Sequence, residues 1–278
     1  RFYDDVSGAT FDYTKPDSLR SVWWGGEPFW VTAVKHGMKA ACYFWPGSEV
    51  EIQGTRPTYY LKYNQNTPNT DRVREVMNWL DYELANRPKF VTLYFSNVDS
   101  NGHTYGPDSS AVKIAVADVD AVIGTLVNYL DASTSRFSPQ LIIVSDHGMA
   151  AIKPENGTII LEDYIDIDTV RIPETAGPHL SLWPYDMDQL DDLLASVSNI
   201  PHVKAWKRDE GFSSFHYEAY VDRIGPIQLM ADVGYVISPT RRIPAGGYTG
   251  GTHGYDPFIK QMTGVFIGYG SEFLNSAK

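Results

Sequence analysis

The sequence predicts an α/β fold with a largely parallel central sheet flanked by helices. Short apolar runs of strand length alternate along the chain with longer segments whose apolar residues recur at helical spacing. Motifs rich in Asp, His and Gly follow directly after two of these runs. In an open α/β sheet, ligands collect beyond the carboxyl ends of the strands, so this placement favours the same fold class.

Strand–helix units follow one another over the first half of the chain. We expect a helix over 28–35 ended by Gly37, a strand over 40–44, and a helix whose apolar face carries Val73, Val76, Met77, Leu80 and Leu84. A buried strand is predicted over 90–95 and another over 141–145. Between them lies the clearest helix, opened by residues 107–109, with an apolar face of Val112, Ala115, Val116, Val119, Val122, Ile123, Leu126 and Leu130.

The pattern changes after Asp163, and residues 164–240 are predicted to form a smaller α+β insertion within one domain that covers 1–278. Strands are expected over 180–183 and 203–206, with a helix over 188–197 between them. Strands over 227–230 and 235–237 are expected to return towards the core, and 264–268 should form a last short strand.

Composition narrows the functional classes. The net charge of −11 over 278 residues disfavours nucleic-acid binding, which relies on Lys and Arg to neutralise phosphates. No apolar run reaches the roughly 20 residues that a membrane span needs. Cys42 is the only cysteine, so an internal disulfide and a thiolate-rich structural zinc site are both excluded. A glycosylation sequon occurs at Asn156.

Three short segments carry the residues best suited to bind a metal. They are Asp99-Ser-Asn-Gly-His103, Ser145-Asp146-His147-Gly-Met149 and Gly251-Thr-His253-Gly-Tyr-Asp256. Carboxylate and imidazole are common zinc ligands, and a mixed set with open positions suits a hydrolytic site. The Asp-x-x-x-His spacing and the adjacent Asp-His pair would let each of two segments present two ligands from a tight loop.

An ordinary structural role is the alternative for each of these residues. A single His beside a Gly is usually a hydrogen-bonded loop residue, and an Asp after a strand commonly caps a turn. The coincidence of three such segments favours the metal. The remaining histidines, His36, His179, His202 and His216, have no acidic partner nearby in the sequence and are interpreted as structural.

These motifs resemble the nucleotide pyrophosphatase/phosphodiesterase family of the alkaline phosphatase superfamily. The resemblance extends in order from about Tyr3 to Phe273 and is weakest between Asn156 and His216. Besides the three metal-binding segments, it rests on Trp23-Trp-Gly-Gly-Glu-Pro28, Phe44-Trp-Pro-Gly-Ser48, Tyr60-Leu-Lys-Tyr-Asn64 and Val265-Phe-Ile-Gly-Tyr-Gly270.

The resemblance implies a centre with two Zn²⁺ ions. Asp99, His103 and His253 would hold one zinc, and Asp146 and His147 the other. Tyr63 matches an aromatic position that sandwiches the base of the substrate, and Trp45 is predicted to line the same region. The family's Thr or Ser nucleophile, a further Asp ligand and a phosphate-binding Asn precede the stretch that matches Tyr3-Asp4, so we expect the domain to be truncated at both ends, without its nucleophile, and nearly inactive alone.

The implied activity is zinc-dependent hydrolysis of nucleotide phosphodiester or pyrophosphate bonds that releases nucleoside monophosphates. One alternative is the same fold acting on choline-type lipid phosphodiesters. The other is a non-catalytic binding module that a metal stabilises. The resemblance also implies a small phosphodiester as the partner and an extracellular or secretory-pathway location, with which the sequon at Asn156 is compatible.

Overall fold

The predicted strand–helix alternation is present in a unit formed by Thr14–Val98, Lys113–Ile142 and Ile267–Lys278 of the computed structural model. The structure describes residues 1–134, 137–210, 215 and 217–274. Strand β3 (Ala40–Tyr43) pairs in parallel with β4 (Tyr59–Leu61) on one side and with β5 (Phe90–Leu93) on the other. All four residues of β3 are buried, as its continuous apolar run predicts for a central parallel strand.

Helix α1 (Phe29–Lys35) precedes β3, and helix α2 (Asn69–Leu80) connects β4 to β5. Gly37, with a φ of 74°, follows the C-terminus of α1, in agreement with the predicted stop. Val73, Val76 and Trp79 form the buried face of α2. The prediction was wrong for Leu84, which lies beyond the last residue of α2 and is 73% exposed.

The long helix α4 (Ser110–Ala132) buries a narrower stripe than its sequence predicts. Its buried residues are Ala115, Val122, Leu126 and Leu130. These positions recur at seven- and four-residue spacing and so lie on one side of the helix. Val116 was predicted on this face but is 50% exposed, because it lies one residue, about 100° of helical turn, from Ala115.

Strand β6 (Leu141–Val144) departs from the prediction in its burial. It pairs with β15 (Phe266–Tyr269) in a two-stranded sheet, and Ile142 and Val144 are each about half exposed. The run Leu-Ile-Ile-Val predicts a strand covered on both faces, but one row of alternate side chains has no covering layer among the described residues. In β5 as well, only Thr92 is buried.

The second unit comprises Arg1–Tyr13, Asp99–Val112 and Ile143–Phe266. Its largest sheet has the order β11-β12-β10-β9 and is antiparallel throughout, with β9 at Val170–Arg171, β10 at His179–Pro184, β11 at Val203–Lys207 and β12 at Ile227–Ala231. The predicted strand over 227–230 is present as β12, which lies between β10 and β11 in this sheet and is buried throughout.

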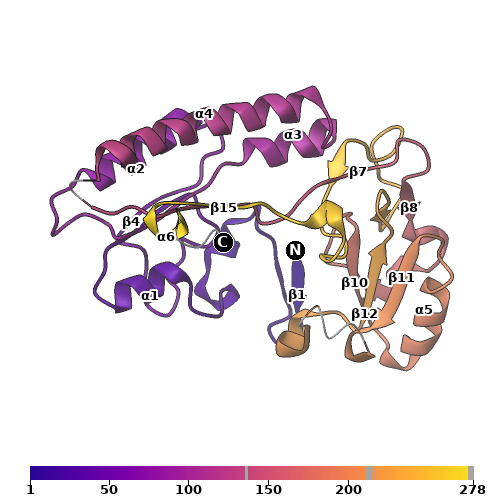
Figure 1. Cartoon of the computed structure of the whole chain (residues 1–278). Coiled ribbons are helices and arrows are strands. Elements are labelled where there is room, and N and C mark those ends of the chain that lie inside the picture. Colours follow the sequence, from indigo (N-terminus) through magenta and orange to yellow (C-terminus); the bar gives the residue numbers. More distant parts are fainter. Residues whose placement is uncertain (135–136, 211–214, 216, 275–278) are drawn as a thin grey trace. The chain divides into compact units, whose positions relative to one another are not determined.

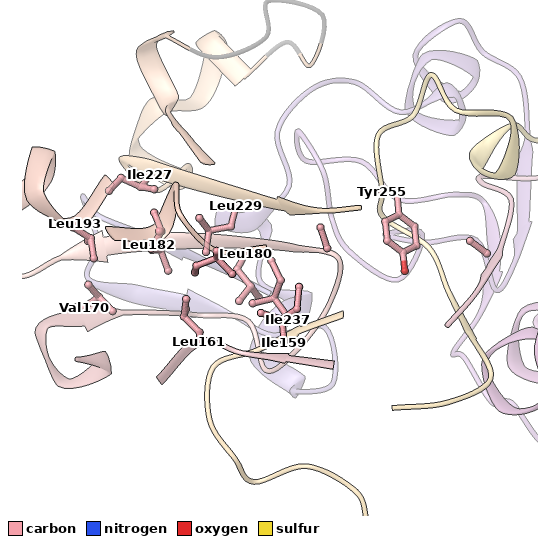
Figure 2. Close-up of a cluster of buried hydrophobic side chains, with 14 of the residues drawn as sticks. Ile159, Leu161, Val170, Leu180, Leu182, Leu193, Ile227, Leu229, Ile237 and Tyr255 are labelled. Atoms are coloured by element: carbon pink, nitrogen blue, oxygen red, sulfur yellow. The ribbon is translucent and has the colours of Figure 1, made fainter. Parts of the chain in front are cut away.

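One face of this antiparallel sheet forms the main core of the unit. Leu180 pairs with Leu229 and Leu182 with Ile227 across β10 and β12, and all four side chains are fully buried (Figure 2). Helix α5 (Leu190–Val197) lies beside β11 and contributes Leu193 and Val197 to the same cluster (Figure 1). The predicted helix over 188–197 therefore exists, although the short 3-10 helix η5 (Met187–Gln189) forms its start.

Smaller elements complete this unit. Strand β1 (Phe2–Asp4) forms a hairpin with β2 (Ala9–Phe11), β8 (Thr158–Ile160) pairs in parallel with β13 (Val236–Ser238), and β7 (Ala150–Ala151) pairs with β14 (Gly251–Thr252). Helix α3 (Asn97–Tyr105) lies mostly within it, and α6 (Ser271–Leu274) belongs to the first unit. None of the helices in the described part of the chain has the length and apolar character needed to cross a membrane.

Candidate metal centre

Helix α3 presents Asp99 and His103 on one face, one turn apart. The predicted tight loop is therefore a helix at this segment, and the i, i+4 spacing brings His103 Nε2 to 3.4 Å from Asp99 Oδ1. Gly106 ends the helix with a φ of 84°, and its N–H donates to the carbonyl of Gly102. The sequence Gly-Pro that follows His103 by three residues thus fixes where the helix stops.

His253 reaches the same point from the other end of the sequence. It follows β14, and its Nε2 lies 3.1 Å from His103 Nε2 and 3.6 Å from Asp99 Oδ1. Three donor atoms therefore form a triangle with edges of 3.1, 3.4 and 3.6 Å. Ligands at about 2.0–2.1 Å from a tetrahedral zinc are separated by about 3.3 Å, so this triangle fits three positions of such a site.

The hydrogen bond of His103 suits a metal ligand. Its Nδ1 lies 3.0 Å from the carbonyl oxygen of Gly251, which can only accept a hydrogen bond, so Nδ1 is the donor. This bond favours the tautomer in which Nε2, the nitrogen directed at the triangle, carries the lone pair. Asp99 Oδ1 is buried and accepts no hydrogen bond from the described residues. A buried carboxylate oxygen without a donor is typical of a metal ligand.

His253 is held neutral by its surroundings. Burial and, to a smaller extent, the neighbouring His147 ring lower its pKa to about 4, although the carboxylate of Asp99 acts in the opposite direction. Since only the neutral imidazole can coordinate, His253 is ready to bind a metal at neutral pH without first losing a proton. The group Asp99, His103 and His253 could thus hold a metal ion.

The structure places His147 and Asp146 beside this group. The ring of His147 stacks on that of His253 with centroids 3.5 Å apart and an interplanar angle of 14°. His147 Nδ1 donates to the carbonyl of Gly148 at 2.8 Å, which leaves Nε2 free, 3.5 Å from Asp146 Oδ2. The Asp146 side chain is 71% exposed. This pair offers two donor atoms, one fewer than the group formed by Asp99, His103 and His253.

Tyr63 and Trp45 lie in the other unit, and their predicted role in substrate binding stays a prediction. The Tyr63 ring is 47% exposed, its hydroxyl donates to Ser96 Oγ at 3.2 Å, and its ring packs edge-on against Phe44. Trp45 packs against the apolar cluster around Val31 and Val50. Packing within the protein therefore explains the position of the Trp45 side chain more fully than that of Tyr63.

The other histidines have the partners expected of structural residues. His179 Nε2 lies 2.8 Å from Gln228 Oε1, and His202 Nδ1 lies 3.2 Å from Asp232 Oδ2 while its ring stacks on Tyr235. The Asp232 partner is 30 residues away in sequence, so inspection of neighbouring residues missed it. His36 caps the C-terminus of α1. His216 lies outside the described residues.

A donor triangle of one carboxylate and two imidazoles, carried by an α/β scaffold, defines the class of a domain with a candidate metal-binding site. The family model described as type I phosphodiesterase/nucleotide pyrophosphatase matches residues 1–256. The chain therefore belongs to that family, as its motifs predicted.

Individual proteins agree with this membership. The chain is 34% identical to a venom phosphodiesterase of Naja atra over 98% of its own length and 33% of the relative's. It matches the structure of murine ectonucleotide pyrophosphatase/phosphodiesterase 5 with a TM-score of 0.88 and 28% identity, over 97% of this chain and 70% of that one. An inactive form of the same murine protein in complex with AMP matches with a TM-score of 0.87, 28% identity and the same coverage.

These similarities confirm the predicted α/β fold class. The chain spans about a third of the length of this venom phosphodiesterase.

Proposed function

We propose that this chain carries the metal-binding part of a phosphodiesterase that hydrolyses nucleotide phosphodiester or pyrophosphate bonds and releases nucleoside monophosphates. The observation that carries the proposal is the convergence of Asp99, His103 and His253 on one point, with Nδ1 of His103 bonded to the carbonyl of Gly251 and Nε2 of both histidines directed to that point. Family membership and the AMP complex of a similar murine protein support the nucleotide as substrate.

Zinc is the metal that we propose for this centre. Two imidazole nitrogens and one carboxylate oxygen at tetrahedral spacing suit it, and three protein ligands leave a position open for substrate or water. When bound, the metal supplies Lewis-acid stabilisation of the phosphoryl oxygens and of the leaving oxygen. Asp146 and His147 are proposed as ligands of a second zinc, which two donor atoms would hold more weakly than three.

The remaining parts of the site are assigned from the family resemblance. Tyr63 is proposed to stack on the base of the nucleotide, since half of its ring is exposed and its hydroxyl is anchored to Ser96. Trp45 is proposed to line the base-binding region. The nucleophile is not assigned to any residue of this chain, because no Ser or Thr in it matches the motif that carries the nucleophile in the family.

Metal analysis tests the proposed centre directly. The purified chain should contain zinc, and His253→Ala should lower the zinc content and raise the dissociation constant at least about 10-fold. His202→Ala is the matched control, because His202 also pairs with an aspartate and stacks on a ring but belongs to no three-donor group among the described residues. Equal zinc contents in both variants would show that the triangle is not the metal site.

Hydrolysis separates the nucleotide function from its alternatives. A protein that contains this chain should cleave a nucleotide p-nitrophenyl ester, and Tyr63→Ala should raise KM for that ester while leaving bis-p-nitrophenyl phosphate unaffected. Preference for a phosphocholine ester would favour the lipid phosphodiesterase, and zinc binding without hydrolysis of either ester would favour the binding module.

A location in the secretory pathway or outside the cell is also proposed. The similar proteins include a venom enzyme, and Asn156 lies exposed in a turn, with a φ of 58°, where a glycan could be attached. Protein expressed in a secretory host should lose mass on treatment with peptide N-glycosidase, and Asn156→Gln should abolish that loss.

A further inference from the structure

Met149 lies at the point where the three metal-binding segments meet. It follows His147 by two residues and precedes β7, which pairs with the strand that leads to His253. Its side chain lies against two glycines at once. A Cβ placed on Gly102 would come within 2.9 Å of Met149 Cε, and one on Gly251 within 3.1 Å of Met149 Cγ and Sδ.

Each of the two glycines adjoins a donor of the candidate metal centre. Gly102 is the residue before His103 in α3, and Gly251 is the residue whose carbonyl accepts the Nδ1 proton of His103. A side chain on either glycine would occupy the space that the thioether fills. The unbranched side chain of Met149 therefore fills the space beside the contact between helix α3 and strand β14.

The backbones of these two segments already approach as closely as they can. A Cβ on Gly251 would lie 2.7 Å from the carbonyl oxygen of Gly102, and one on Gly250 would lie 2.1 Å from that of His103. Because neither backbone can move inward, the side chain of Met149 limits how the two can slide past each other. The His103 imidazole takes its orientation from Gly251, so this limit extends to the metal ligand.

We propose that Met149 is a positioning residue: by filling the space beside Gly102 and Gly251, it holds the carbonyl of Gly251 where it orients the His103 imidazole towards the metal. This inference rests on the proposed function of the site. A merely structural role would lower the stability of the unit without changing the tautomer of His103 or the geometry at the metal.

Three variants separate these roles. Met149→Ala empties the gap, and Met149→Leu keeps a Cγ, the atom that lies close to both glycines. Met230→Ala is the matched control, since Met230 is 8% exposed on β12 and its truncation creates a comparable defect in the antiparallel sheet of the same unit. Urea unfolding of each metal-free variant measures the loss of stability that all truncations are expected to share.

The first readout needs no metal. Long-range ¹H–¹⁵N correlation spectra of the metal-free protein give the tautomer of His103, which should carry its proton on Nδ1 in the wild type, Met149→Leu and Met230→Ala. In Met149→Ala we expect a mixture of tautomers, because the bond to Gly251 loosens. An unchanged His103 tautomer in Met149→Ala would overturn the proposal.

The second readout uses cobalt as a spectroscopic probe of the zinc position. Co²⁺ should bind Met149→Ala about 10-fold more weakly than the wild type, with an altered visible absorption band, while Met230→Ala stays within about twofold. Gly102→Ala combined with Met149→Ala should recover part of the affinity, since the added methyl group enters the vacated gap. Equal Co²⁺ affinities for Met149→Ala and Met230→Ala would contradict the proposal. If the wild type binds neither zinc nor cobalt, the proposed function fails, and the tautomer still decides the role of Met149.

Discussion

Gly250→Ala tests whether close backbone contact builds the candidate metal centre. Gly250 has a φ of 79°, and a Cβ there would lie 2.1 Å from the carbonyl oxygen of His103 and 3.0 Å from that of Thr104. Two costs follow. A left-handed backbone costs a residue with a side chain about 1–2 kcal/mol, and relief of the clash requires a backbone shift of about 1 Å, because nonbonded C···O contacts are rarely shorter than about 3.2 Å.

Gly246→Ala isolates the first of these costs. Gly246 lies four residues earlier, has a φ of 83°, and a Cβ there would meet nothing within 4 Å. It should therefore lower the free energy of unfolding by only about 1–2 kcal/mol, whereas Gly250→Ala should add a further 1–3 kcal/mol or so of overpacking. The difference between the two variants measures the contact between Gly250 and α3.

The assays are urea unfolding of the metal-free chain and zinc affinity by chelator competition. Gly250→Ala should weaken zinc binding about 10-fold or more, because the displaced carbonyl belongs to the ligand His103 itself. Gly246→Ala should bind zinc like the wild type. If both variants lose the same stability and neither changes zinc affinity, the close approach of α3 and β14 does not hold the ligands, and the reasoning is refuted.

Three further predictions follow from single side chains. Excess chelator should lower the melting temperature of the wild type. The loss should equal about 3 kcal/mol of unfolding free energy if zinc is otherwise present at 100 times its dissociation constant. His147→Ala should lower the zinc content, and a melting curve unchanged by chelator would contradict both expectations. Burial raises the pKa of Glu174 from 4.5 to about 7, so folding stability should fall by up to about 3 kcal/mol as the pH rises from 4.5 to 7, and Glu174→Gln should flatten that slope in urea unfolding. Arg72 is 2% exposed and donates to the carbonyls of Gln65, Thr67 and Tyr94. Arg72→Met should therefore lower the free energy of unfolding by at least about 3 kcal/mol, measured by thermal unfolding. Arg74→Met, which breaks an exposed ion pair with Asp71, should lower it by less than about 1 kcal/mol.

Periodicity in the sequence predicted the elements that bury a continuous or regularly spaced apolar surface. The strand at Ala40–Tyr43 is buried throughout, and the helix that carries Val73 and Val76 packs by those residues, as the pattern requires. Gly37 follows the end of a helix where its conformational freedom predicts. Local rules succeed at these positions because the residue alone decides the backbone conformation.

Burial was predicted less well, because it depends on what lies opposite an element. The run Leu141–Val144 has the composition of a doubly covered strand, yet Ile142 and Val144 are half exposed. The same applies to Val116, whose apolar side chain lies outside the buried stripe of its helix. Composition states only that a side chain could be buried, and its partners are set by chain segments far away in sequence.

The candidate site shows the same division between chemistry and geometry. Residue type and spacing selected the three segments that contain the candidate ligands, and the family resemblance grouped Asp99, His103 and His253, although 150 residues separate the two histidines. They gave no indication that Asp99 and His103 lie on a helix, or that a carbonyl at Gly251 fixes the imidazole. The glycines at 102, 250 and 251 were the sequence signal for the contact between His103 and Gly251, because they allow the two backbones to approach where a side chain would clash. In this site, the glycines beside the candidate ligands mark where another segment of the chain approaches.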